Sequence, residues 1–280
     1  MRAVLLTLCL IGSFDAHADS LTDIMYAKVG ETSLQLDLHR PPKPSAPLIV
    51  YVHGGAWRSG SKEDVPIGAL VDQGFAIASV NYRLSTQARF PAQIHDIKAA
   101  IRFLRAKSHE LQVNADRIAI VGSSAGGHLA ALVGVTNGNV ALEGTIGEHL
   151  DQSSSVQSIV SFYGASNLES ILAQSTEFGL TVRIPALKLL LGGLPDKEVA
   201  LARLASPVAH IDSQDPPLWL IHGDADPQMP PLQSQEFAEA YRKAGLQVTH
   251  RVLKGSKHGG PEFYETAVLS EVAKFLQQRR

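Results

Sequence analysis

The chain has 280 residues, of which 45% are hydrophobic and 19% are charged, so it is long enough to form one large domain with a substantial core. Its formal net charge is −2 at pH 7, and it has no cluster of Lys and Arg that could follow a phosphate backbone. Composition and charge therefore give no support to nucleic-acid binding.

The first 18 residues have the pattern of a secretory signal peptide. Arg2 stands near the amino terminus, an apolar stretch covers 3–12, and Ala16-His17-Ala18 has the form of an A-x-A cleavage site. An apolar stretch of this length is too short to span a bilayer, which needs about 20 residues. The pattern predicts residues 1–18 as a signal peptide, cleavage after Ala18, and a mature domain over 19–280 that is periplasmic or secreted.

Eight apolar runs bounded by turn residues are typical of β-strands. The first two alternate polar and apolar residues around Gly30-Glu31-Thr32, which predicts an antiparallel hairpin. Helical stripes of apolar residues follow later runs, for example from Ile94 to Leu104 and from Val268 to Leu276. This alternation predicts an α/β fold with a central, mostly parallel, eight-stranded sheet and helices on both faces. The expected strands are 24–29, 34–39, 48–53, 75–80, 118–121, 156–162, 218–222 and 248–253.

One long connection interrupts this alternation. About 55 residues separate the strand ending near Phe162 from the strand starting near Leu218, which is more than one crossover helix requires. Within it, 168–194 is predicted to form short helices that act as a lid or a pocket wall, because ligands of open α/β sheets bind at the carboxyl ends of strands. The alternative is a solvated excursion.

A G-x-S-x-G pentapeptide, Gly122 to Gly126, follows the apolar run 118–121 directly. A strand can turn sharply into a helix only where small residues flank the apex, and such a turn exposes the central serine above the sheet. The sequence therefore predicts Ser124 as a nucleophile. The helix expected over 125–135 directs its N-terminus, including the N–H of Ala125, at the same point, where it would stabilise a developing negative charge.

A serine hydroxyl needs a base to accept its proton and an acid to orient that base. Two aspartates, Asp224 and Asp226, follow the seventh strand, and Asp226 is the better candidate because Asp224 stands in a tight glycine turn, where Asp commonly binds backbone. His258 follows the last strand. The chain order Ser124, Asp226, His258 is the order of an α/β-hydrolase triad, and each residue follows a different strand. We therefore expect these three residues to form the catalytic triad.

The loop after the third strand, His53 to Trp57, is predicted to complete an oxyanion hole. The N–H groups of Gly55 and Ala56 would point at the anion together with the N–H of Ala125. His53 is expected to orient the loop through a hydrogen bond rather than to act in catalysis. Trp57 is a candidate substrate-pocket residue, and packing at the domain surface is its alternative.

Other polar residues are expected to be structural. His95, Asp96 and Arg102 fit a solvated helix face or a salt bridge, and His128 fits packing or a hydrogen bond. The chain has 11 histidines but no H-E-x-x-H motif, and its only cysteine stands inside the predicted signal peptide. The sequence therefore predicts neither a metal site nor a cofactor.

Taken together, these motifs resemble the α/β-hydrolase carboxylesterases, in particular bacterial feruloyl and acetylxylan esterases, which lie near the hormone-sensitive-lipase-like esterases. Ala56 replaces the third glycine of the lipase-like branch, and the HGGxW form is also shared with kynurenine formamidases. The resemblance extends over nearly all of 19–280. It rests on HGGAWRSGSK from His53, VNYRLS from Val80, FPAQIHDIKAAIRFLR from Phe90, GSSAGGHLAAL from Gly122, FYGASNL from Phe162, SPVAHI from Ser206, HGDADPQMP from His222 and KHGG from Lys257.

The resemblance implies an exported serine carboxylic-ester hydrolase that works through an acyl-enzyme. Its expected substrates are acetyl or hydroxycinnamoyl (feruloyl) esters of plant polysaccharide, or similar small esters. Two alternatives stay open. One is an arylformamidase-like amide hydrolase, which would use the same triad, and the other is a catalytically silent binding protein on a hydrolase scaffold.

Overall fold

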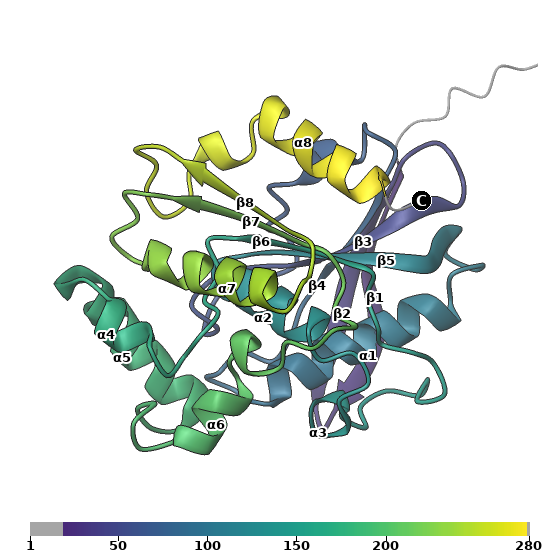
Figure 1. Cartoon of the computed structure of the whole chain (residues 1–280). Helices are drawn as coiled ribbons and strands as arrows, with labels where there is room; N and C mark the ends of the chain where they lie inside the picture. Colours follow the sequence, from purple (N-terminus) through teal and green to yellow (C-terminus); the bar gives the residue numbers. More distant parts are fainter. Residues whose placement is uncertain (1–18, 279–280) are drawn as a thin grey trace, which may run out of the picture.

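The computed structural model describes residues 19–278, so the predicted signal peptide at 1–18 lies outside the described residues. A twisted sheet of eight strands crosses the molecule in the order β1-β2-β4-β3-β5-β6-β7-β8 (Figure 1). β1 and β4 pair with β2 in antiparallel fashion, and all later neighbours are parallel. The strands are β1 (Asp19–Val29), β2 (Thr32–Arg40), β3 (Ala46–Val52), β4 (Ala76–Val80), β5 (Val113–Ser123), β6 (Ser158–Phe162), β7 (Leu218–Gly223) and β8 (Val248–Leu253).

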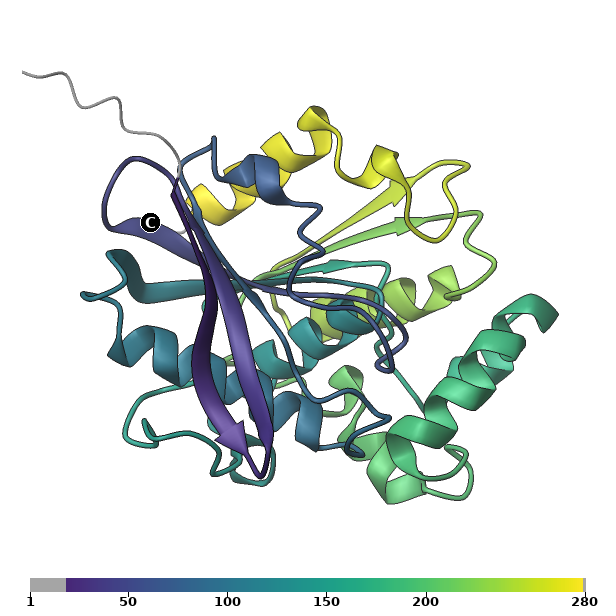
Figure 2. The same ribbon diagram turned by 180° about the vertical axis from the view of Figure 1, so that it is seen from behind.

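Helices cover both faces of this sheet, so the predicted fold class is confirmed. Figures 1 and 2 show α8 on one face and α1, α2 and α7 on the other. The helices are α1 (Ala92–Ala106), α2 (Ala125–Gly134), α3 (Val140–Glu143), α4 (Ile171–Gln174), α5 (Glu177–Leu191), α6 (Val199–Leu204), α7 (Pro231–Lys243) and α8 (Thr266–Gln277), with single 3₁₀ turns η1 (Gly68–Leu70), η2 (Pro207–Ala209) and η3 (Pro261–Phe263). Among the described residues, no helix combines the length and apolar character that crossing a membrane requires.

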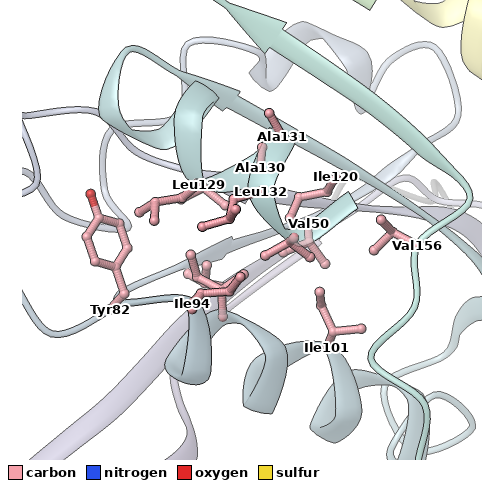
Figure 3. Close-up of a cluster of buried hydrophobic side chains, with 14 of the residues drawn as sticks. Val50, Tyr82, Ile94, Ile101, Ile120, Leu129, Ala130, Ala131, Leu132 and Val156 are labelled. Atoms are coloured by element: carbon pink, nitrogen blue, oxygen red, sulfur yellow. The ribbon is translucent and has the colours of Figure 1, made fainter. Parts of the chain in front are cut away.

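The core is divided into two layers because successive side chains of a strand point to opposite faces. On β3, Ile49 and Tyr51 belong to the cluster beneath α8, whereas Val50 belongs to the cluster beneath α1 and α2. Figure 3 shows this second cluster, in which Ile94 and Ile101 of α1 face the sheet. Full burial of such a side chain contributes about 1.5–3 kcal/mol, so the two layers hold the central strands rigidly in place.

Three elements differ in extent from the sequence expectation. β1 begins at Asp19 rather than near Ile24, and its first residue pairs with Arg40 of β2. β5 begins at Val113 rather than near Ile118, because its first half has one exposed face that carries Asn114 and Asp116. The segment predicted as several short helices contains the one-turn helix α4 and a single 15-residue helix, α5. Figures 1 and 2 show α4 and α5 beyond the strand ends, away from the layered part of the domain.

Asp96 and Arg102 of α1 are buried rather than solvated, and His95 is half-buried. Asp96 has no exposed side-chain surface and forms an ion pair with Arg83 at 2.7 Å. Arg102 is equally enclosed and pairs with Glu143 at 2.6 Å. The expected salt bridges are therefore present, but the expected solvated face is wrong, because the β1–β2 hairpin and the α3 region cover this part of the helix.

Candidate active site

Ser124 stands at a strained turn between β5 and α2. Its backbone angles are φ 55° and ψ −117°, a region that side-chain-bearing residues rarely occupy. The flanking glycines allow this turn, since a Cβ on Gly126 would lie 2.0 Å from the carbonyl oxygen of Val52, and one on Gly122 would lie 2.2 Å from that of Gly126. Because α2 packs directly on the backbone of β3, the serine is fixed at the carboxyl edge of the sheet.

Three side chains meet at this edge. The Oγ atom of Ser124 lies 2.9 Å from Nε2 of His258, and Nδ1 of the same ring lies 2.7 Å from Oδ2 of Asp226. Since the Nδ1–H group donates to the carboxylate, Nε2 carries the lone pair that accepts the serine proton. The structure thus brings together the residues that the sequence predicted from three separate loops, after β5, β7 and β8.

The carboxylate of Asp226 is held by several donors. Oδ1 accepts the N–H groups of Gln228 and Met229, both at 2.8 Å. Burial alone would raise the pKa of Asp226, but the hydrogen bonds from His222 and His258 outweigh it and hold that pKa well below the usual range. The group therefore stays ionised at neutral pH.

Asp224, the other candidate acid, faces solvent. Its Oδ1 atom accepts the N–H of Gly255 at 2.6 Å. This is the backbone-binding turn role that the sequence assigned to it.

The loop after β3 faces Ser124 across a cavity of about 450 Å³. Gly55, with φ 100°, and Ala56, with φ 51°, line this cavity together with Ser124 and His258. A Cβ on Gly55 would lie 2.1 Å from the carbonyl oxygen of Ser59, so the tight loop requires glycine there. Within residues 19–278, the N–H groups of Gly55, Ala56 and Ala125 donate to no protein acceptor. They are available to a ligand at the serine.

A family model named BD-FAE matches residues 36–241, a span that includes Ser124 and Asp226 and ends before His258. The chain belongs to the BD-FAE family. This membership, with the esterases among the relatives below, confirms the resemblance to α/β-hydrolase carboxylesterases that the motifs indicated.

Relatives of this BD-FAE chain include Esterase LipQ of Mycobacterium tuberculosis, which is 32% identical over 256 residues. That alignment covers 88% of this chain and 59% of LipQ, so the chain spans little more than half the length of that relative. A solved structure described as a truncated form of a carbohydrate esterase from gut microbiota is 31% identical, with a TM-score of 0.86, covering 95% of this chain and 98% of that one. A bifunctional GH43-CE protein from Bacteroides eggerthii is 33% identical, with a TM-score of 0.84, covering 93% of this chain and 35% of that one.

In the BD-FAE chain, His53 supports the loop without facing the cavity. Its Nδ1–H group donates to the carbonyl oxygen of Gly54 at 2.9 Å, and its ring stacks on Tyr82 with centroids 4.5 Å apart. Burial lowers the pKa of His53 below its ordinary value, which keeps the ring neutral. The side chain thus has the orienting contact expected from the sequence.

Trp57 is fully buried and is absent from the residues that line the catalytic cavity. Its indole N–H donates to Nδ1 of His128 at 3.0 Å, and Nε2 of His128 lies 2.7 Å from the carbonyl oxygen of Ala205. Burial lowers the pKa of His128 to about 4, so this ring is neutral. The structure therefore places Trp57 in the interior rather than on the pocket wall, and its contact ties the β3 loop to α2.

One wall of the BD-FAE cavity consists of hydroxyl groups that sequence reasoning missed. Tyr51 O–H donates to Oγ of Ser123 at 3.1 Å, and that Oγ lies 2.7 Å from the hydroxyl of Tyr264. The hydroxyls of Tyr264 and Tyr163 are 2.5 Å apart. We call these four residues the hydroxyl wall. Ser123 and Tyr163 stand inside quoted motifs, but Tyr264 follows η3 without any motif that marks it.

Part of the cavity lining comes from α5 and the loop after β7. Val182 of α5 and Gln228 both line it. The buried Arg183 donates from Nη2 to the carbonyl oxygen of Gln228 at 3.2 Å, and Oγ1 of Thr176 donates to that of Pro227 at 2.6 Å. Helix α5 is thus joined to the same loop whose N–H groups hold Asp226.

Proposed function

We propose that this BD-FAE chain is a serine carboxylic-ester hydrolase that works through an acyl-enzyme. The observation that carries the proposal is the continuous hydrogen-bonded path from Ser124 through His258 to Asp226, at 2.9 and 2.7 Å. An esterase and a carbohydrate esterase among the relatives support the same activity. In this proposal Ser124 is the nucleophile, His258 the general base and acid, and Asp226 the group that orients the base.

The first half of the reaction forms the acyl-enzyme. Nε2 of His258 takes the serine proton while Oγ of Ser124 attacks the ester carbonyl carbon, and Asp226 stabilises the imidazolium that results. The N–H groups of Gly55, Ala56 and Ala125 would receive the negative charge on the carbonyl oxygen. Because these donors are fixed before substrate arrives, each contributes to the rate by about 10²–10³-fold.

The second half releases the products. When the tetrahedral intermediate collapses, the bond between the carbonyl carbon and the alcohol oxygen breaks, and Nε2–H of His258 gives its proton to the departing alcohol. A water molecule then gives a proton to His258 and attacks the acyl carbon. The second tetrahedral intermediate then collapses, which frees the carboxylic acid, and His258 returns the proton to Oγ of Ser124.

We propose acetyl or hydroxycinnamoyl esters of plant polysaccharide, or similar small esters, as the substrates. The hydroxyl wall supports this choice, because Ser123, Tyr163 and Tyr264 can exchange hydrogen bonds with a polyhydroxy alcohol, while the buried Tyr51 supports Ser123 from behind. The carbohydrate esterase among the structural relatives supports it as well. The signal-peptide pattern at 1–18 would bring the enzyme to the periplasm or the cell exterior, where such esters occur.

Hydrolysis of p-nitrophenyl acetate tests the activity itself. Ser124→Ala should lower kcat by about 10⁴-fold or more, since it removes the nucleophile. Ser79→Ala is a matched control, because Ser79 is fully buried in β4 and its Oγ has no hydrogen-bond partner within the described residues. If wild-type turnover does not exceed that of Ser124→Ala, the chain is a catalytically silent binding protein and the proposal fails.

A panel of methyl ferulate, acetylated xylan, N-formylkynurenine and a long-chain triglyceride tests the substrate class. The proposal predicts the highest kcat/KM for acetylated xylan or methyl ferulate. Faster release of formate from N-formylkynurenine would identify an amide hydrolase and overturn the polysaccharide assignment, although the triad chemistry would be the same.

A further inference from the structure

A second histidine contacts the carboxylate of Asp226. Oδ2 of Asp226 lies 2.7 Å from Nδ1 of His258 and also 3.2 Å from Nε2 of His222. His222 is the second-last residue of β7 and only 1% of its surface is exposed, so it reaches neither the cavity nor solvent. The catalytic steps proposed above make no use of this ring.

The surroundings of His222 fix its tautomer. Nε2 lies 3.2 Å from Oδ2 of Asp226 and 3.1 Å from the carbonyl oxygen of Met229, and because both are acceptors this nitrogen must carry the hydrogen. The other ring nitrogen, Nδ1, lies 2.6 Å from Oγ of Ser234, whose hydroxyl donates to it. Ser234 belongs to α7 and is itself buried, so no water competes for this contact.

We propose that His222 is a positioning residue for ester hydrolysis: its Nε2–H group, on a ring that Ser234 holds through Nδ1, turns the Asp226 carboxylate toward Nδ1 of His258. This inference rests on the proposed serine-hydrolase function. The carboxylate has no rotational freedom in this arrangement, because Oδ1 is held by two backbone N–H groups and Oδ2 by two imidazoles. His222 thereby orients Asp226, which in turn orients His258.

Charged and titratable groups around this pair determine how pH affects it. Asp226 faces His258 and His222, and the positive charge of Arg183 on α5 attracts it. Burial lowers the pKa of Arg183 to about 10, so the guanidinium stays charged at neutral pH. His250 of β8 also interacts with His222, and burial lowers the pKa of His250 below its ordinary value. Loss of the His222 donor would leave more of the Oδ2 charge to stabilise the protonated ring of His258.

Steady-state kinetics on three variants test the proposal, with active sites counted by a fluorophosphonate so that misfolded protein does not contribute. His222→Leu should lower kcat about 10- to 100-fold at nearly unchanged KM, since a hydrogen bond to a charged group is lost. The acidic limb of its kcat/KM profile should move to higher pH. Ser234→Ala should give a kcat between those of His222→Leu and wild type, because it removes the hydrogen bond that holds the imidazole at Nδ1 but keeps the Nε2–H donor.

His222→Gln provides the conservative rescue, since the glutamine amide can present an N–H group near the former Nε2. It should restore kcat to within about fivefold of wild type. If His222→Leu has the kcat of wild type per titrated active site and an unshifted acidic limb of kcat/KM, the role of His222 is purely structural and the proposal is overturned. A His222→Gln variant as slow as His222→Leu would overturn it as well. An inactive wild-type enzyme would instead refute the proposed function.

Discussion

The carboxylate of Asp226 lies 2.7 Å from Nδ1 of His258, although 32 positions separate the two residues in the chain. The pairing of β7 with β8 accounts for this distance, because the parallel register runs from Leu218↔Val248 to Gly223↔Leu253. Both strands therefore end at the same edge of the sheet, and the loops that follow them start side by side. The backbone register brings the acid and the base together before any side chain is oriented.

This relationship predicts unequal effects for the two neighbouring aspartates. Asp226→Asn should lower kcat by about 10³–10⁴-fold, because the amide can hold His258 in the wrong tautomer. Asp224→Asn changes an exposed side chain whose one hydrogen bond among the described residues is from the N–H of Gly255, and kcat should stay within about twofold of wild type. The measurement is the initial rate on p-nitrophenyl acetate. Similar losses in both variants would contradict the assignment of Asp226.

The hydroxyl wall predicts a change of substrate preference in Tyr264→Phe. Removal of this hydroxyl leaves Ser123 and Tyr163 without their shared partner, so KM for acetylated xylan should rise about five- to tenfold. For p-nitrophenyl acetate, whose alcohol offers no hydroxyl network, kcat/KM should change by about twofold at most. Tyr241→Phe is the matched control, because the buried hydroxyl of Tyr241 on α7 donates to the carbonyl oxygen of Pro216 and does not line the cavity. Equal changes for both substrates would rule out a role of the wall in binding the alcohol.

The close approach of α2 to β3 predicts that Gly126→Ala is strongly destabilising. The added Cβ would lie 2.0 Å from the carbonyl oxygen of Val52, and backbone cannot yield as a flexible side chain can. We expect a loss of about 3 kcal/mol or more in the free energy of unfolding, measured by urea denaturation. Gly68→Ala is the comparison, since its Cβ would meet nothing within 4 Å. A Gly126→Ala variant as stable as Gly68→Ala would contradict the described packing.

The half-buried Asp215 predicts that the difference in stability between Asp215→Asn and wild type depends on pH. Burial raises the pKa of Asp215 to about 7, although the backbone N–H of Asp212 opposes the rise, whereas an unfolded aspartate has a pKa of about 3.9. A folded pKa above the unfolded one means that this group's stabilisation is complete below about pH 4 and is lost as pH rises through about 7. Asp215→Asn keeps an acceptor for the N–H of Asp212 without the charge. Its Tm should exceed that of wild type by on the order of 2–4 °C at about pH 8 and equal it near pH 4. A constant difference would contradict the prediction.

The elements that the sequence could predict are those with a local signal. All eight predicted strands are present, and they could be predicted because turn residues bound their apolar runs. Asp226 could be distinguished from Asp224 because Asp224 stands in a tight glycine turn. The first half of β5 was missed because Asn114 and Asp116 make its exposed face look like a loop. The position of Trp57 could not be predicted from the sequence. Whether its side chain lines the pocket or fills the interior depends on its contact with His128 of α2, which forms only when the chain folds. The same applies to Tyr264.

Helix α5 has a further consequence for how substrate enters. Thr176 and Arg183 bind the carbonyl oxygens of Pro227 and Gln228, and the same short loop holds the carboxylate of Asp226 through its N–H groups. A swing of α5 away from the sheet would pull on these carbonyls and disturb the acid at the moment of opening. We therefore expect esters to reach Ser124 through the open mouth of the cavity while α5 stays in place. In such an enzyme, substrate entry and product release would require no movement of α5, so neither would have to alternate with the reaction at Ser124.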